Sequence, residues 1–271
     1  MARLVTPPPE STPAEWGKRL AYLACVLIPV LLLVVLLLND RVALQSFRWD
    51  QVQLTSTPPM SREEFLREVK AIGAFGDTLP VAEPGFLDRL RQAAIRHEWV
   101  ESVSRVAITG QGTLQLDLTF RTPVARLERS GQIQLVDRYG KLFTPFPKLA
   151  VQQLIPLVGW EDRTNDAMQW LPQAGQLASQ LQNELSAWKI VSLHLVRNKP
   201  LDLVELHLKT QAGTSIIWQT LHGSSLEEPM AEEKLSSLRL YFERYGNLDA
   251  PPGQVLDVRR KEGLQRRAVG P

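Results

Sequence analysis

The sequence predicts an α+β protein with three successive parts. These are a single N-terminal transmembrane helix, a small β-α-α-β-β domain, and a mixed β domain with flanking helices. Three observations predict this class: an uncharged apolar run near the N-terminus, two amphipathic helix patterns after it, and many short strands separated by glycine or proline. The 271 residues are enough for one to two globular domains at about 150 residues each.

The composition excludes several function classes. Lys and Arg number 31 against 29 Asp and Glu, a net charge of +2, which argues against a dedicated nucleic-acid binder. One cysteine excludes an intramolecular disulfide framework and a cysteine-rich zinc site, and four histidines leave little material for a metal centre. With 44% hydrophobic residues, the chain can bury a core.

An uncharged run from Leu20 to Leu38 decides the predicted topology. At ~1.5 Å rise per residue, a helix over this run would span about the ~30 Å hydrocarbon core of a bilayer. A cleaved signal peptide is the competing interpretation, but its apolar region is normally only ~7–15 residues long, and no A-x-A pattern follows here. We therefore predict a retained transmembrane helix over 20–39 and a disordered cytoplasmic tail over 1–19. The remainder is expected outside the cytoplasm, because long domains translocate largely regardless of their charge.

Residues 45–122 are predicted to form the small domain. Alternation over Phe47–Leu54 indicates a first strand, and the capping box that starts at Ser61 begins a first helix. Pro84 suits the first turn of a second amphipathic helix. Two strands then form a hairpin around a glycine-containing turn: Ser102–Thr109 and Thr113–Arg121.

Residues 123–271 are predicted to form the β domain, in which glycine and proline punctuate short strands. The expected strands are Val124–Glu128, Gln132–Val136, Leu142–Phe143, Ile190–Val196, Leu203–Leu208, Thr214–Thr220, Val255–Arg259 and Leu264–Val269. The expected helices are Pro172–Ala187 and Pro229–Tyr245, and Gly246 ends the second of them.

Several short motifs now combine in order. They are Leu90-Arg91, Glu98-Trp99-Val100, Pro123-Val124-Ala125, Val136-Asp137 with Gly140, Leu154-Ile155-Pro156-Leu157 with Gly159, Arg239-Leu240 with Tyr245, and Asp257-Val258-Arg259 with Gly263. Their order and spacing over 45–271, together with the apolar run, resemble the FtsQ/DivIB family of bacterial cell-division proteins. The chain departs from the family pattern at Glu98, where proline is usual, at Phe120, where an acidic residue is usual, and at Arg260, where an aromatic residue is usual.

The resemblance implies a fold and a function. It implies a polypeptide-transport-associated (POTRA) domain beside the membrane, a β domain after it, and a non-catalytic scaffold of the division machinery at the septal cell membrane. In the family, the terminal strands receive FtsB in complex with FtsL. Carried over to this chain, the partner-binding residues are Arg259, Arg260, Glu262, Gly263, Leu264, Gln265, Arg266, Arg267, Ala268 and Val269.

Catalytic motifs are not found in the sequence. His97 and Glu101 make only half of a zincin helix, since a glutamate stands where the second histidine belongs. His194 and His207 are expected on solvent-facing sides of a hairpin, where contact between them would give a two-ligand site. No Gly-x-Ser-x-Gly, P-loop or dinucleotide-binding turn is present. We predict a protein that is not an enzyme, with no catalytic, cofactor-binding or metal-binding residues and no nucleic-acid or small-molecule partner.

Two other function classes stay open. One is a POTRA-containing component of polypeptide transport or outer-membrane assembly, although residues 123–271 lack the repeated amphipathic strands of a membrane barrel and no second POTRA-like unit is found. The other is a membrane-anchored hydrolase, which would need a nucleophile assembled from residues far apart in the chain.

Overall fold

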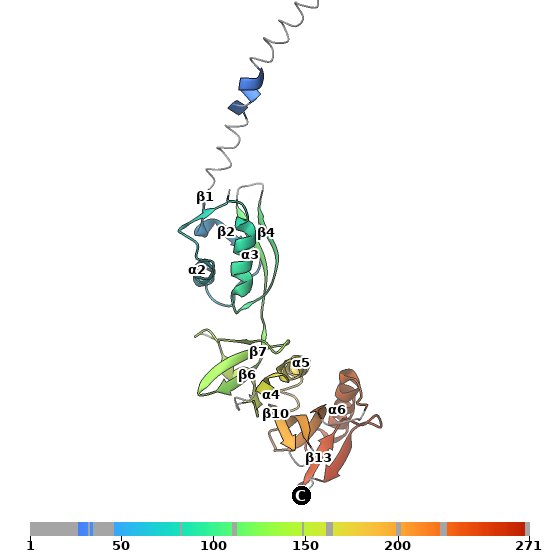
Figure 1. Ribbon diagram of the computed structural model, residues 1–271. Helices are drawn as coiled ribbons and strands as arrows, with labels where there is room; N and C mark the ends of the chain where they lie inside the picture. Colours follow the sequence, from blue (N-terminus) through green and yellow to red (C-terminus); the bar gives the residue numbers. More distant parts are fainter. Residues whose placement is uncertain are drawn as a thin grey trace, which may run out of the picture. The chain divides into compact units, whose positions relative to one another are not determined.

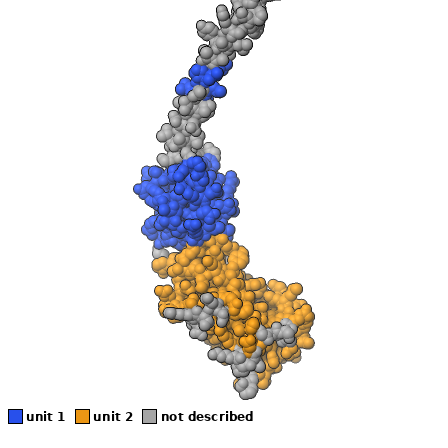
Figure 2. Space-filling view, viewed as in Figure 1, with its two compact units in different colours: residues 1–97, 102–119 blue, residues 98–101, 120–271 orange. Residues whose placement is uncertain are grey.

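The computed structural model describes residues 27–31, 33–34, 46–81, 83–109, 113–147, 149–160, 165–198, 202–222 and 227–268. Within these ranges the fold is mixed α/β, with 14 strands and 5 α-helices. The chain divides into two compact units, shown separately coloured in Figure 2: residues 1–97 with 102–119, and residues 98–101 with 120–271. The proposed domain limits at 45, 122 and 123 stay predictions.

The expected transmembrane helix needs correction. Among the residues that the structure describes, no helix is both long enough and apolar enough to cross a bilayer. Of the segment 20–39, only 27–31 and 33–34 are described, and both stretches are helical. The predicted fold class is therefore wrong in this part. The apolar run Leu20–Leu38 is long enough for a membrane span, but the helical stretches that the structure describes within it are too short for one. The tail 1–19 lies outside the described residues.

From residue 46 onward, the described part of unit 1 contains helices α2 and α3 and two small sheets (Figure 1). Its elements are β1 (Ser46–Arg48), the 3₁₀ turn η1 (Trp49–Gln51), β2 (Val52–Leu54), α2 (Arg62–Ile72), β3 (Thr78–Pro80), α3 (Phe86–Arg96), β4 (Val100–Ile108) and β5 (Leu114–Phe120). One sheet has the order β2-β5-β4 and the other pairs β1 with β3. Helix α2 begins where expected, because the Ser61 hydroxyl accepts the Glu64 N–H at 3.2 Å.

The first strand is broken, contrary to the prediction over Phe47–Leu54. The backbone N–H of Arg48 donates to the Gln51 side chain at 3.0 Å, which closes the η1 turn. The two halves of the segment then join different sheets, since Phe47 pairs with Leu79 and Val52 pairs with Leu114. Alternation in the sequence could not show this, because it reports which residues are buried and not which strand they pair with.

Unit 2 is built on one nine-stranded sheet with the order β14-β13-β12-β11-β10-β9-β6-β7-β8. Its strands are β6 (Pro123–Arg129), β7 (Gln132–Asp137), β8 (Leu142–Phe143), β9 (Ile155–Val158), β10 (Ile190–Asn198), β11 (Leu203–Thr210), β12 (Ser215–His222), β13 (Gln254–Asp257) and β14 (Gln265–Ala268). The pairs β6–β9, β9–β10 and β12–β13 are parallel, so the sheet is mixed. Strand β9 was not predicted, because Pro156 within it is a poor strand former.

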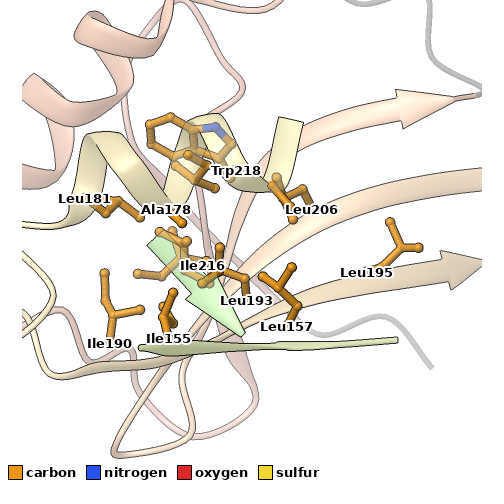
Figure 3. Close-up of a cluster of buried hydrophobic side chains, with 14 of the residues drawn as sticks. Ile155, Leu157, Ala178, Leu181, Ile190, Leu193, Leu195, Leu206, Ile216 and Trp218 are labelled. Atoms are coloured by element: carbon orange, nitrogen blue, oxygen red, sulfur yellow. The ribbon is translucent and has the colours of Figure 1, made fainter. Parts of the chain in front are cut away.

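Three helices accompany this sheet: α4 (Asn165–Met168), α5 (Leu171–Leu181) and α6 (Ala231–Tyr245). Buried residues of α5 and α6 join those of the strands in one hydrophobic core. Figure 3 shows Ala178 and Leu181 of α5 close to sheet residues such as Leu193 and Ile216. Gly246 caps α6 with φ of 73°, the left-handed conformation that glycine adopts at low cost. Helices α5 and α6 therefore pack on one face of the sheet, and α6 lies toward the β13–β14 end.

The turn between β7 and β8 shows why Gly140 stands in its motif. The Asp137 carboxylate accepts the backbone N–H groups of Tyr139 and Lys141 at 2.9 and 2.8 Å. Gly140 has φ of 77°, and a Cβ on it would lie 2.4 Å from the backbone nitrogen of Pro172. The glycine thus lets the first turn of α5 sit directly on this loop.

Candidate partner-binding edge

Strand β14 is the end strand of the nine-stranded sheet. It pairs antiparallel with β13, in the register Leu256↔Arg266 and Val255↔Arg267. Within the described residues no strand lies on its other side, and all four of its side chains are exposed. An end strand carries backbone N–H and C=O groups that do not pair within the sheet. This edge can therefore accept a further strand from another chain.

A groove, which we call the α6 groove, lies between this edge and helix α6. Its volume is about 480 Å³. The lining residues are Ser237, Leu240, Tyr241, Arg244, Tyr245, Gly263, Leu264 and Arg266. Two of its apolar side chains are open to solvent, with exposed fractions of 64% for Leu240 and 46% for Tyr245. An apolar helix face beside a free sheet edge suits a peptide that adds both backbone and side-chain contacts.

Arg266 is fixed over the tyrosines of α6. Its Nη2 and Nε atoms donate to the Tyr241 hydroxyl at 2.8 and 3.2 Å. Its guanidinium carbon lies 5.3 Å from the Tyr241 ring centroid and 4.7 Å from the Tyr245 centroid, both within cation–π range. The tyrosines thus fix the position of the Arg266 guanidinium in the lining of the groove.

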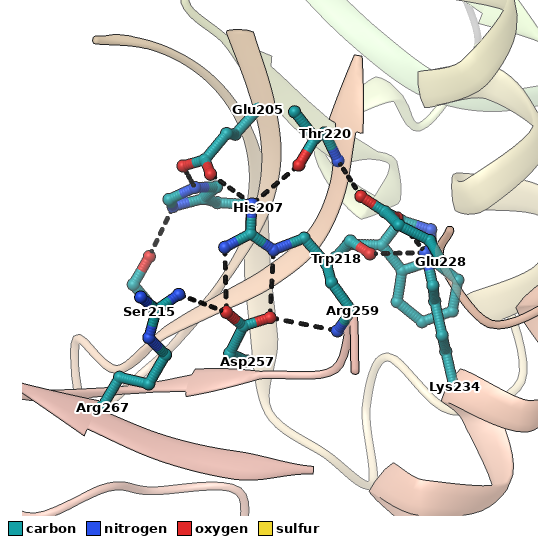
Figure 4. Close-up of polar contacts among 10 residues, drawn as sticks. All are labelled: Glu205, His207, Ser215, Trp218, Thr220, Glu228, Lys234, Asp257, Arg259 and Arg267. Carbon is teal, nitrogen blue, oxygen red and sulfur yellow. Dashed lines mark hydrogen bonds and ion pairs between the residues drawn. The ribbon is translucent and has the colours of Figure 1, made fainter. Parts of the chain in front are cut away.

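Arg259 occupies a different environment, inside the polar cluster drawn in Figure 4. It donates to both carboxylate oxygens of Asp257, at 3.0 and 2.8 Å, and also to Glu205 and to the Thr220 hydroxyl. Arg267 of β14 reaches the same Asp257 at 2.7 Å. We call Glu205, Thr220, Asp257, Arg259 and Arg267 the Arg259 cluster. It ties β11, β12, β13 and β14 together by charge-assisted hydrogen bonds.

The ionisation of the Arg259 cluster follows from these contacts. Burial by itself would raise the pKa of Asp257, but the hydrogen bonds from Arg259 and Arg267 outweigh burial and lower that pKa to about 2. For Glu205, burial is likewise outweighed, by the His207 hydrogen bond and the Arg259 charge, and the pKa is lowered. Burial would lower the pKa of Arg259, but Asp257 and Glu205 raise it. All three groups are therefore charged near neutral pH.

The carried-over partner-binding residues fall into three groups. Arg259 is buried, with an exposed fraction of 7%, and its polar contacts are internal. Gln265, Arg266, Arg267 and Ala268 form β14 itself, while Arg260, Gly263 and Leu264 are half-buried and Glu262 is exposed beside it. Val269 lies outside the described residues. The structure thus brings the β14 residues to one open edge, whereas Arg259 is buried and shares the Asp257 carboxylate with Arg267.

Sequence reasoning missed the contribution of α6 to this site. Tyr245 on this helix is exposed, whereas Tyr241 is buried. The signal was the spacing of Tyr241 and Tyr245, four residues apart, which places both rings on one helix face. Only the closeness of β14 makes that face part of a groove.

Three of the four histidines make side-chain hydrogen bonds within the fold. His97 is buried, and its Nε2 lies 2.9 Å from the Glu68 carboxylate. His194 and His207 are opposite one another in register. His194 forms a hydrogen bond with Ser192, and His207 forms hydrogen bonds with Ser215 and Glu205. His207 is also buried, not solvent-facing. No group of three or more possible metal ligands occurs among the described residues.

One row of side chains has the order of a hydrolytic triad. Ser215 Oγ lies 2.9 Å from His207 Nδ1, and His207 Nε2 lies 2.9 Å from Glu205 Oε2. Ser215 and His207 are both buried, with exposed fractions of 8%. Glu205 also bonds Arg259. A nucleophile must reach its substrate, and this buried row instead joins the side chains of β11 and β12.

Comparison of the chain with known protein families finds no matching family model, and comparison with characterised proteins finds no match.

Proposed function

We propose that this protein is a non-catalytic scaffold that captures a partner chain by adding one of its segments as a strand beside β14. The observation that supports this most is the open edge: β14 ends the sheet in the described residues, and the α6 groove runs beside it. Main-chain hydrogen bonds along such an edge would supply affinity, and the groove would supply specificity.

The sequence resemblance suggests who the partner is. We propose that the chain acts in the bacterial division machinery, in the cell envelope at the septum, and that it recruits small single-pass proteins of the FtsB/FtsL type. Several weak contacts of this kind can together give a stable complex when the partners share a confined space, because the effective concentration of each partner is then high.

The test is capture of such partners by the full-length chain and by two proline variants. Along an antiparallel strand, successive residues turn their N–H groups to opposite sides, so Gln265→Pro and Ala268→Pro remove N–H groups on opposite sides of β14. One variant loses a bond to β13 and is less stable. The other loses a bond only to an added strand, so it should melt like the parent chain while failing to capture the partner.

The readout is mass spectrometry of proteins retained from solubilised membranes of the native cell, with thermal melting of each variant alongside. Arg105→Glu, an exposed charge change on β4 in unit 1, is the matched control and should capture normally. Retention of the partner by both proline variants would rule out strand addition at β14. Recovery of unfolded outer-membrane proteins instead would favour the transport alternative.

A further inference from the structure

The side chains of β14 are divided between two faces of the sheet. Because cross-strand neighbours point to the same side, Arg266 lies on the side of its partner Leu256, which is fully buried in the core that α6 covers. Alternation places Ala268 and Leu264 on that side too. Arg267 lies on the opposite side, with Asp257. The α6 side of this edge is therefore the side from which a partner's side chains would be selected.

The two arginines of β14 differ in how their charge is balanced. Arg267 has the Asp257 carboxylate at 2.7 Å. Arg266 donates to the neutral Tyr241 hydroxyl, and in the part of the chain that the structure describes no carboxylate lies within ion-pair distance of it. Among the described residues, the groove is lined by two arginines, Arg244 and Arg266, and by no acidic residue. Within this part of the chain its positive charge is therefore not balanced.

An added strand would bring such a molecule within reach. Neighbouring strands lie about 4.8 Å apart, and directly opposite Cβ atoms are about 4.5–5.5 Å apart. A Glu or Asp opposite Arg266 would meet a guanidinium already positioned by two tyrosines. Residues two positions away on the same partner strand would face the groove, where Leu240 and Tyr245 offer apolar surface.

We infer that Arg266, held by Tyr241 and Tyr245, selects a partner strand that carries a carboxylate opposite it with an apolar residue two positions away on each side. This inference rests on the proposed strand addition at β14. A neutral residue at that position leaves the guanidinium without a counter-charge in a partly apolar groove, and a basic residue adds repulsion.

The experiment uses synthetic nine-residue peptides that are identical except at the centre. Leucines stand two positions either side of the centre, threonines fill the other face, and the central residue is glutamate, glutamine or lysine. Binding to the full-length chain is measured by fluorescence anisotropy. We expect the glutamate peptide to bind about 10-fold more tightly than the glutamine peptide, the gain of one charge-assisted pair, and the lysine peptide to bind most weakly.

Variants of the protein then assign the preference to one residue. In Arg266→Gln the glutamate and glutamine peptides should bind within about 3-fold of each other, and in Arg266→Glu the lysine peptide should bind best. Arg105→Glu makes the same charge reversal on an exposed strand of unit 1 and should keep the parent preference. Circular dichroism and melting of each variant verify that it is folded.

Failure of the selection and failure of strand addition give different results. Equal binding of the three peptides, or a glutamate preference that survives Arg266→Gln, overturns the selection by Arg266. Two further glutamate peptides test the strand itself. Each is N-methylated at one of two successive backbone nitrogens, which point to opposite sides of a strand, so one of the two peptides loses an N–H group that would donate to β14. If both methylated peptides bind like the parent peptide, or if no peptide binds, strand addition at β14 is wrong and the selection falls with it.

Discussion

The Arg259 cluster and the α6 groove lie at the same end of one sheet, but they differ in how an arginine charge is balanced. Arg259 is buried and is matched by Asp257 and Glu205. Arg266 is exposed and rests on two tyrosines. A charge that the fold itself satisfies holds the strands in place, whereas a charge that the fold orients but does not neutralise is available to a partner. Substitutions in the two regions should accordingly separate stability from binding.

The largest effect is expected from Arg259→Met. It leaves Asp257 and Glu205 with less counter-charge in a buried site, and breaking such a cluster by removing one partner typically costs about 3–5 kcal/mol. Urea unfolding of the parent and the variant measures this free energy. Arg259→Lys, which keeps the charge but not the forked geometry, should recover only part of it. A loss below about 1 kcal/mol would mean that the cluster is not what secures the β13 end.

A smaller loss of stability is expected when acid protonates the Asp257 carboxylate. Its pKa in the folded chain, about 2, lies below the ordinary value of 3.8. The carboxylate therefore contributes stability above pH ~4, and this contribution, about 2 kcal/mol, is lost as the pH falls through the folded value. The difference in unfolding free energy between the parent and Asp257→Asn should shrink between pH 5 and pH 2 on this account. A difference that is independent of pH would contradict the low pKa.

Arg266→Gln should change the free energy of unfolding by less than about 1 kcal/mol, since an exposed cation–π contact contributes only about 0.5–1 kcal/mol. The same variant should lose the preference for acidic peptides. Thermal melting and peptide binding on one protein sample test both halves. A loss of stability as large as that of Arg259→Met would remove the distinction between the two regions.

The smallest effect is expected from Lys261→Met. Its ammonium lies 2.6 Å from Glu227, but both side chains are exposed. Such surface ion pairs contribute about 0–1 kcal/mol, and salt screens them. Unfolding at low and high salt should therefore show little change in either condition. A clear loss would indicate that the segment before β14 is held more firmly than its exposure suggests.

Individual elements could be predicted where the signal is local. The Ser61 cap, the Gly246 stop and the β10–β11 hairpin are present because capping hydrogen bonds, left-handed glycine and strand alternation act over a few residues. The broken first strand and the unpredicted β9 depend on pairing with distant strands. The apolar run Leu20–Leu38 predicts a transmembrane helix from its composition and length alone, and among the described residues no such helix is found.

The same division applies to the site. The position of β14 near the chain end and its basic character could be predicted from the sequence, and so could the absence of familiar catalytic motifs. The burial of Arg259 could not, because its partners Glu205 and Thr220 stand far away in the sequence. Alternation predicts that the adjacent Arg266 and Arg267 face opposite sides of β14, but the sequence could not show that it is Arg267 that meets a carboxylate of the fold.

By itself, the sequence determined the local elements of this protein, its modest net charge and its basic C-terminal strand, since these follow from residue type and short-range spacing. Only the tertiary structure decided that β14 is the end strand among the described residues, that α6 lies beside it, and which arginine is balanced by a carboxylate of the fold. The physical reason is that charge balance depends on distances of a few ångströms between strands that are remote in the chain, and only sheet pairing and helix packing set those distances.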